Sequence, residues 1–333
     1  MKIGIFSPNW IGDAVMSLQF INRLHEEYPN DELIIVSKSW VKAVYKNHPY
    51  IDHVISFPSN KLKGIINTIN NGRKLHNIKF DILYVLPDSF RSAFISSLSR
   101  AKKRIGYSGQ LRNIFLTDPI NINKKGIHRS RKFLKLLPDY RKKDNTEYIG
   151  ISLLEDEKKW AKNIFKQNSL IKPIGILSGS VAPSRSISSG KWINILQDRL
   201  APKTEIIIIG DAAEESKAKE IISSVSNLRV ISFCGKYDLR QSIALISQCY
   251  MVIAADSGLG HISADLDIPT VSLFGAGNYK ITGPIGKNTD VVTANVHCSP
   301  CEKNICTNVS DPLICINNLS ASKIWTANNQ FKI

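Results

Sequence analysis

Apolar runs alternate with amphipathic segments along the N-terminal part of the chain. Short runs rich in β-branched residues, without strict alternation of apolar and polar positions, predict buried strands over Lys2–Phe6, Glu32–Ser37, Val54–Phe57 and Asp81–Leu86. Between them, apolar positions at helical spacing predict helices over Asp13–Tyr28, Val41–Asn47 and Leu62–Leu75. Strands and helices that alternate in this way favour a parallel sheet covered by helices on both faces.

A second series of the same kind follows a charged segment. Residues Glu155–Lys166 predict a bridging helix with Trp160 and Phe165 on its buried side. The later strands are predicted over Pro173–Leu177, Glu205–Ile209, Val230–Phe233, Met251–Ala255 and Thr270–Phe274, and the later helices over Lys191–Leu200, Ser216–Val225, Leu239–Ser247 and, weakly, Ser320–Asn328. The pattern therefore indicates two similar α/β halves joined near residues 150–172.

Length and composition agree with two domains. The chain has 333 residues and 43 % hydrophobic residues, which suits two domains of about 150 residues, each with its own core. We expect domains over residues 1–155 and 172–315, followed by a tail or helix over residues 316–333.

The charge is unusually positive, at a formal +16. Fourteen Lys or Arg residues lie between Arg100 and Lys143, against only two acidic residues, Asp118 and Asp139. Such a stretch suits an anionic partner, such as a nucleic acid, an acidic membrane surface or a phosphorylated glycolipid. A solvated basic face explains the same charges without any partner, so both interpretations stay open.

Neither a signal peptide nor a membrane span is expected. The apolar run Lys2–Phe6 is short and turns at once into Ser7-Pro8-Asn9. No apolar run approaches the roughly 18 residues that a membrane-spanning helix needs. We expect a cytoplasmic protein that docks on a membrane surface at most.

Two loops of the first half follow predicted strands, where open α/β sheets bind ligands. The first contains Trp10-Ile11-Gly12-Asp13, and Asp13 there is either a helix cap or a general base that points into a cleft. This loop lacks G-x-G-x-x-G, which argues against a nicotinamide dehydrogenase. The second places Ser89 and Arg91 at a helix N-terminus, as an anion or hydroxyl site or as an ordinary cap beside a surface arginine.

Three loops of the second half carry further candidates. Ser178–Arg185 is rich in small residues, and its backbone N–H groups could hold a phosphate while Arg185 pairs with the charge; it is not a Walker loop. In Gly210–Glu215, a carboxylate after a strand is either a ribose ligand or a solvated acid. In Asp256-Ser257-Gly258-Leu259-Gly260-His261, a helix N-terminus could face a diphosphate, and His261 is structural or a ligand.

Together these segments resemble the ADP-heptose:lipopolysaccharide heptosyltransferases of glycosyltransferase family nine, nearest to the heptosyltransferase II type. The resemblance runs nearly end to end. It is carried by Trp10-Ile11-Gly12-Asp13, Leu86-Pro87-Asp88-Ser89-Phe90-Arg91-Ser92-Ala93, Arg104-Ile105-Gly106-Tyr107, Gly235-Lys236-Tyr237-Asp238-Leu239 and Asp256-Ser257-Gly258-Leu259-Gly260-His261. It implies a GT-B fold, in which two Rossmann-like domains face each other across a cleft, with the acceptor on the N-terminal domain and the donor on the C-terminal one.

The resemblance also implies an inverting, metal-independent reaction without a cofactor. Asp13 would be the base and Arg185 the diphosphate cation. The donor site would comprise Ser180, Glu214 at the ribose, Tyr237 near the adenine, Asp256, Ser257, Gly258 and His261. The acceptor site would comprise Trp10, Ser89, Arg91 and Arg104.

The loop after the first donor-domain strand departs from the family pattern, which has a lysine followed by Trp-Pro. Here Arg185 takes the lysine position, and Ile187-Ser188 replaces Trp-Pro. Arginine can still neutralise a diphosphate, although its fork geometry differs from the lysine ammonium group. ADP-heptose is therefore the expected donor, and another nucleotide sugar is the alternative.

Four cysteines cluster near the end of the chain: Cys298, Cys301, Cys306 and Cys315. The Cys298-x₂-Cys301 spacing would suit a structural zinc. Because a convincing zinc site usually has two such pairs, we favour reduced or packed thiols. Cys234 and Cys249 are expected in the core.

The expected reaction is attack of an acceptor hydroxyl, deprotonated by Asp13, on the anomeric carbon of ADP-heptose. Arg185 and the helix start at Asp256-Gly258 would stabilise the leaving ADP. The acceptor would be the anionic lipopolysaccharide core, reached at the cytoplasmic face of the inner membrane of a Gram-negative-type bacterium. Nucleic-acid binding is the rival suggested by charge alone, and the chain lacks helix-turn-helix, zinc-finger and RNP signatures.

Overall fold

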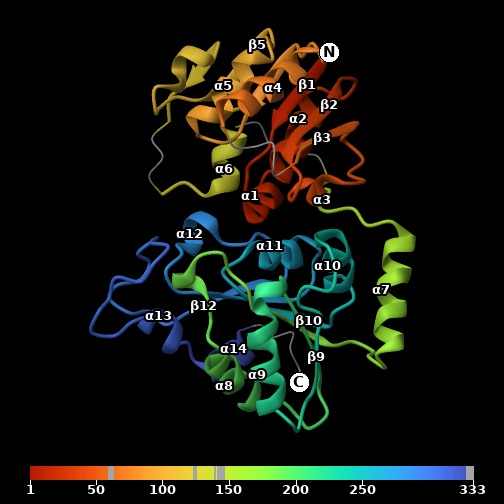
Figure 1. Ribbon diagram of the computed structural model, residues 1–333, viewed down its shortest axis with the longest axis vertical. Helices are drawn as coiled ribbons and strands as arrows, with labels where there is room; N and C mark the ends of the chain where they lie inside the picture. The colour runs from red at the N-terminus through yellow and green to blue at the C-terminus, as the bar shows by residue number, and fades with distance from the viewer. Residues whose placement is uncertain (59–63, 123–125, 139, 141–146, 328–333) are drawn as a thin grey trace. The chain divides into compact units, whose positions relative to one another are not determined.

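The computed structural model describes residues 1–58, 64–122, 126–138, 140 and 147–327. The chain divides into two compact units, Met1–Ser152 and Leu153–Ile333. In Figure 1 the first unit has the red to yellow colours and the second has the green to blue colours.

The first unit is a parallel six-stranded sheet with helices packed on it. The sheet has the order β3-β2-β1-β4-β5-β6 and consists of β1 (Lys2–Phe6), β2 (Glu32–Lys38), β3 (His53–Phe57), β4 (Ile82–Val85), β5 (Lys103–Tyr107) and β6 (Asp118–Ile120). Its helices are α1 (Ile11–Met16), α2 (Leu18–Glu27), α3 (Lys42–Tyr45), α4 (Ile65–His76), α5 (Phe90–Leu98), η2 (Arg112–Phe115) and α6 (Arg129–Leu134). β4 is buried along its whole length and β2 at all but its two end residues, as expected where helices cover both faces.

The helix predicted over Asp13–Tyr28 is in fact two helices, α1 and α2, which meet at Ser17. The Ser17 hydroxyl lies 2.7 Å from the carbonyl oxygen of Ala14 and 3.0 Å from the Tyr45 hydroxyl. A serine that bonds back to the preceding turn commonly bends a helix. The apolar spacing is the same on both sides of the break, so the pattern alone could not reveal it.

The second unit repeats the same topology. Its parallel sheet has the order β12-β11-β10-β7-β8-β9 and consists of β7 (Ile174–Leu177), β8 (Glu205–Ile209), β9 (Arg229–Ser232), β10 (Met251–Ala255), β11 (Thr270–Phe274) and β12 (Thr289–Thr293). Its helices are α7 (Glu155–Gln167), η3 (Pro183–Arg185), α8 (Ser189–Gln197), η4 (Ala212–Glu214), α9 (Glu215–Ser224), α10 (Leu239–Ile246), α11 (Gly258–Asp265), α12 (Tyr279–Thr282), α13 (Ile314–Asn317) and α14 (Ala321–Thr326). None of the helices in the described part of the chain is long and apolar enough to cross a membrane.

The helices before and after the second sheet in the sequence, α7 and α14, both belong to the second unit. Helix α7 packs on α10. Its Glu157 pairs with Arg240 through two hydrogen bonds of 2.7 and 2.6 Å, and Trp160 meets Tyr237 edge to face. At the other end, Trp325 of α14 is buried and donates from its indole N–H to the carbonyl of Ile195, 2.8 Å away. Residues near the C-terminal end therefore add to this core.

The prediction missed the strands β5, β6 and β12. β6 and β12 lie at sheet edges, where one side of the strand has no neighbour, and they carry acids at Asp118 and Asp290. β5 begins with two basic residues, Lys103 and Arg104. None of the three has the apolar run by which the inner strands were recognised.

Candidate active site

Each sheet reverses its strand order once, between β1 and β4 in the first unit and between β7 and β10 in the second. Ligands of open α/β sheets bind outside the carboxyl ends of the strands at this switch point. The loops that follow these four strands contain Asp13, Ser89, Arg185 and Asp256 or lead directly to them. The two units therefore each bring predicted site residues to the switch point of their own sheet.

Asp13 is the third residue of α1, and the N-cap position belongs to Trp10. The interpretation of Asp13 as the helix cap is therefore wrong. Its carboxylate is about one-fifth exposed, and its Oδ1 lies 3.8 Å from Nε of Arg129 on α6. An opposite charge at this distance favours the ionised carboxylate, which is the state that a general base needs.

A buried tyrosine lies behind α1. The hydroxyl of Tyr45 lies 2.9 Å from the Ser7 hydroxyl and 3.0 Å from the Ser17 hydroxyl. Burial raises the pKa of Tyr45 to about 12, and the negative charge of Asp13 adds to the effect. Tyr45 therefore stays protonated at neutral pH and cannot take a proton from a substrate in place of Asp13.

The Arg129–Asp13 pair makes a testable contribution. Arg129→Gln should lower kcat by about three- to tenfold, because the Asp13 carboxylate then loses the ion pair that holds it in position. Arg129→Lys should restore most of the rate, since it keeps the charge. Steady-state kinetics of the wild type and both variants measure this. An unchanged kcat in Arg129→Gln, or an equal loss in Arg129→Lys, would contradict a role based on charge.

The proposed acceptor residues differ in their exposure and in their hydrogen bonds. Trp10 and Arg91 are exposed. Ser89 caps α5 and accepts a hydrogen bond of 3.2 Å from the Ser92 N–H, as its interpretation as an ordinary cap predicts. Arg104 lies near the start of β5, and its guanidinium donates to the carbonyl oxygens of Phe115 and Ala101 at 2.9 and 2.7 Å. In a parallel sheet, the amino-terminal ends of the strands lie opposite the carboxyl ends, where the switch-point site is located. We therefore leave Arg104 out of the acceptor site.

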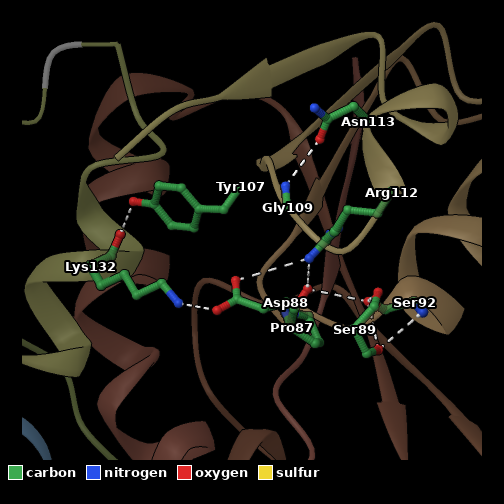
Figure 2. Close-up of polar contacts among 9 residues, drawn as sticks. All are labelled: Pro87, Asp88, Ser89, Ser92, Tyr107, Gly109, Arg112, Asn113 and Lys132. Carbon is green, nitrogen blue, oxygen red and sulfur yellow. Dashed lines mark hydrogen bonds and ion pairs between the residues drawn. The ribbon is translucent and has the colours of Figure 1, made fainter. Parts of the chain in front are cut away.

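The sequence analysis missed a buried charge cluster beside this switch point. Figure 2 shows Asp88, in the loop after β4, between Lys132 of α6 and Arg112 of η2. Lys132 forms an ion pair with Asp88 Oδ2, and the Tyr107 hydroxyl donates to the Lys132 carbonyl. Arg112 donates to the carbonyl of Pro87 at 2.6 Å, and burial lowers its pKa.

This cluster corrects the interpretation of the basic stretch as one patch or one solvated face. Arg112 and Lys132 are buried, Arg104 binds backbone carbonyls, and Lys102 pairs with Asp81 at 2.7 Å. Lys124, Lys125 and residues 141–143 of the stretch lie outside the described residues.

In the second unit, Arg185 and Asp256 form a pair at the switch point. Nε of Arg185 lies 3.3 Å from Oδ2 of Asp256, and the Ser180 hydroxyl donates to the backbone carbonyl of Asp256 at 3.0 Å. These contacts join the loop after β7 to the loop after β10. Burial raises the pKa of Asp256 to about 6, although the nearby Arg185 opposes this shift. Burial therefore outweighs the attraction of the arginine here.

Helix α11 begins directly after Asp256, so its first N–H groups lie at the switch point. Its N-cap residue, Ser257, makes no capping bond, and its buried hydroxyl lacks a hydrogen-bond partner among the described residues. Gly258 opens the helix and His261 is buried in its first turn. Gly277 leaves space for Asp256, because a methyl group there would overlap the Asp256 carboxylate. A helix start with an unused buried hydroxyl suits an anionic ligand.

Glu214 and Tyr237 follow β8 and β9. The Glu214 carboxylate accepts from the Ser178 hydroxyl at 3.0 Å and from Lys217 at 2.9 Å, so it is held rather than freely solvated. Tyr237 is half-buried, with its ring edge to face against Trp160 and Phe233. Both lie after the carboxyl ends of their strands, on the side that the ribose and adenine assignments require.

The departure at Ile187-Ser188 has a structural explanation. Ile187 is fully buried in the core of the second unit. Ser188 caps α8 and accepts a hydrogen bond of 3.2 Å from the Lys191 N–H. These two residues therefore anchor the chain immediately after Arg185.

The cysteine-rich segment holds the Arg185 loop. Ser184 is buried, its hydroxyl donates to the carbonyl of Lys303 at 2.5 Å, and its N–H donates to the carbonyl of Asn304 at 3.0 Å. All six cysteines are free thiols, and Cys234 and Cys249 are buried as expected. Within the described ranges, no group of three or more His, Cys, Asp or Glu side chains is arranged to hold a metal ion.

Ser184→Ala should therefore weaken binding of the donor and leave the properties of the first unit unchanged. Loss of one buried hydrogen bond costs about 1 kcal/mol, and the Lys303 carbonyl loses its partner. We expect the KM for the donor to rise a few-fold while vesicle binding stays the same. Titration calorimetry with the nucleoside diphosphate measures the effect, and unchanged affinity would contradict the assigned anchoring role.

Comparison with known proteins agrees with this geometry. The family model described as glycosyltransferase family 9 (heptosyltransferase) matches residues 69–310, which is well over half of the chain. The chain belongs to glycosyltransferase family 9. Among its family 9 relatives, lipopolysaccharide heptosyltransferase 2 of Escherichia coli K12 is 24 % identical over 314 residues, covering 88 % of each chain.

Solved structures of family 9 proteins share the fold. A family 9 glycosyltransferase of Veillonella parvula has a TM-score of 0.81 and 20 % identity, covering 99 % of this chain and 96 % of that one. The ADP-heptose heptosyltransferase II of Escherichia coli has a TM-score of 0.73 and 22 % identity, covering 88 % and 90 %. The expected α/β fold of the GT-B class is thus confirmed.

Proposed function

We propose that this family 9 glycosyltransferase transfers heptose from ADP-heptose to the inner core of lipopolysaccharide, with inversion at the anomeric carbon. The observation that carries the proposal is the set of polar groups at the two switch points. Asp13 lies beside Arg129 in the first unit, and Arg185 lies near the start of α11 in the second. Relatives named as heptosyltransferase 2 support the choice of heptose and of lipopolysaccharide.

Asp13 is the proposed base. It takes the proton from the acceptor hydroxyl as the oxygen attacks the anomeric carbon, while Arg129 holds the carboxylate in position. Trp10 and Arg91, both exposed near this switch point, are the proposed contacts for the sugar and the anionic groups of the acceptor. Ser89 contributes by fixing the start of α5.

The second unit is proposed to hold the donor. The bond between the anomeric carbon and the diphosphate oxygen breaks with its electron pair leaving on ADP. Arg185 and the first N–H groups of α11, with the Ser257 hydroxyl, are placed to stabilise that charge. His261 lies just inside the helix. Ser180 fixes the Asp256 loop, and Glu214 and Tyr237 are the proposed ribose and adenine contacts.

The direct test is incubation of the protein with ADP-heptose and truncated core acceptors, followed by product mass measurement. A mass increase of one heptose, retained in EDTA, is the expected result. Parallel reactions with other nucleotide sugars address the alternative that Arg185 raises. A product with another donor and none with ADP-heptose would overturn the donor assignment while preserving the reaction class.

A further inference from the structure

Three large apolar side chains gather on the surface of the first unit beside α5. Leu111 is 86 % exposed, Ile114 is 80 % exposed and Phe90 is 46 % exposed. Leu111 is the N-cap residue of η2, and Ile114 lies within this short helix. The ring of Phe90 meets Phe115 edge to face at 5.1 Å, which joins α5 to this turn. We call Phe90, Leu111 and Ile114 the turn patch.

Hydrogen bonds hold the turn from its inner side. Figure 2 shows Arg112 directed inward, where it is 1 % exposed and donates to the Pro87 carbonyl at 2.6 Å. Its Nη1 also lies 3.9 Å from the Asp88 carboxylate, and the Gly109 N–H donates to Asn113 Oδ1 at 3.1 Å. Arg112 is thus anchored inside, while its neighbours Leu111 and Ile114 are exposed.

Displaying a leucine here runs against backbone preference. Gly109, Gln110 and Leu111 have successive φ angles of 128°, 50° and 56°. The left-handed region is disfavoured for a residue such as leucine and suits glycine or asparagine better. An exposed leucine in this conformation stabilises neither the turn nor the core, which points to a contact outside the chain.

The charge around the turn patch identifies the chemistry of that contact. From Ser89 to Thr117 the chain carries no acidic residue, and of its basic residues Arg91, Arg100 and Lys103 are exposed. Arg91 is exposed beside Phe90, and it lies close enough to Lys38 to contribute, after burial, to the lowered pKa of Lys38. The acid that follows, Asp118, accepts a hydrogen bond from Thr117. Apolar side chains set among cations complement a surface with anionic headgroups above an apolar interior.

We propose that the turn patch inserts into the surface of an anionic phospholipid bilayer. The inference rests on the proposed function, since it concerns how the enzyme reaches a lipid-linked acceptor. Leu111 and Ile114 enter the boundary between headgroups and acyl chains, while Arg91 stays at the headgroup level. The buried Arg112 keeps the turn in shape as it leaves water.

Sedimentation with vesicles of phosphatidylcholine and phosphatidylglycerol tests this directly. The double variant Leu111→Asn, Ile114→Asn removes the apolar tips, and asparagine tolerates the left-handed conformation at residue 111. Its partition onto vesicles should fall by about tenfold or more, and the difference from wild type should persist at high salt, because apolar contacts are not screened. Ile114→Trp should bind more tightly than wild type.

The matched control is the double variant Ile171→Asn, Val309→Asn. These two side chains of the second unit are 83 % and 91 % exposed, so the same apolar surface is lost elsewhere. This control should bind vesicles like wild type. The inference would be overturned by no binding of the wild type, by an equal loss in both double variants, or by a difference that disappears in salt.

Turnover of a water-soluble truncated acceptor separates this inference from the proposed function. It should be unchanged in the Leu111→Asn, Ile114→Asn variant, whose turn patch lies outside the proposed catalytic groups. A wild type that forms no heptosylated product would overturn the proposed function, and the vesicle result would still decide the inference. Product formation with unaltered vesicle binding of this variant would overturn the inference alone.

Discussion

Asp13→Asn should reduce turnover by about 10²- to 10⁴-fold while leaving the fold and the donor affinity intact. The amide has the shape of the carboxylate but cannot accept a proton at neutral pH. Because Trp10 occupies the N-cap position, the substitution removes no cap. It removes one acidic charge from the first turn of a helix, which costs about 0.3–1 kcal/mol of stability. Single-turnover kinetics with a soluble acceptor gives the chemical step directly.

A matched control is Glu155→Gln, which removes an acid from the first turn of α7, where its partner is Lys158. It should cost a similar stability and leave turnover near wild type. Thermal unfolding of both variants separates loss of fold from loss of chemistry. Near-native turnover in Asp13→Asn would show that another group takes the acceptor proton.

The inner strands and their order along the chain could be predicted because they are buried on both faces and consist of apolar runs. Four such strands lie at the centre of the second sheet and three, β1, β2 and β4, in the first, and the loops after them could be located from the pattern alone. The inner strand β5 was missed because it begins with two basic residues. The edge strands β6 and β12 could not, since an edge needs less burial and tolerates Asp118 and Asp290. The helix break at Ser17 depends on Tyr45, a tertiary contact that no local pattern encodes.

The site divides in a similar way. Candidate residues that follow a central strand, such as Asp256 and Arg185, could be selected from the sequence because strand ends mark the switch point. Arg129 and the cluster of Asp88, Arg112 and Lys132 were missed, because their sequence positions show only a basic stretch. Arg104 shows the same limit, because sequence cannot tell a guanidinium that binds a ligand from one that binds backbone carbonyls.

Asp256→Asn should make the protein more stable at neutral pH and less active. Burial raises the pKa of Asp256 to about 6 in the folded chain, against about 3.9 in an unfolded one. Below about pH 4 the carboxyl is protonated in both the folded and the unfolded state, so it does not lower the free energy of unfolding. As pH rises toward 6, the unfolded chain ionises first, so stability falls, and above about pH 6 the loss is complete.

The uncharged amide avoids this loss. Asp256→Asn should therefore gain on the order of 1–3 kcal/mol over wild type at about pH 7.5 and little at about pH 4, as measured by urea unfolding at both values. Turnover should fall by up to about 10²-fold, because Arg185 is then no longer fixed by a charge 3.3 Å away.

The control variant is Asp198→Asn, at an acid paired with Arg199, which should show no such pH-dependent gain in stability. If Asp256→Asn destabilises the protein at neutral pH, the attraction between Arg185 and Asp256 outweighs burial, and the pair is then a structural ion pair. If the Asp256→Asn variant gains stability and loses turnover as expected, then the Asp256 carboxylate serves the reaction and lowers the stability of the folded protein.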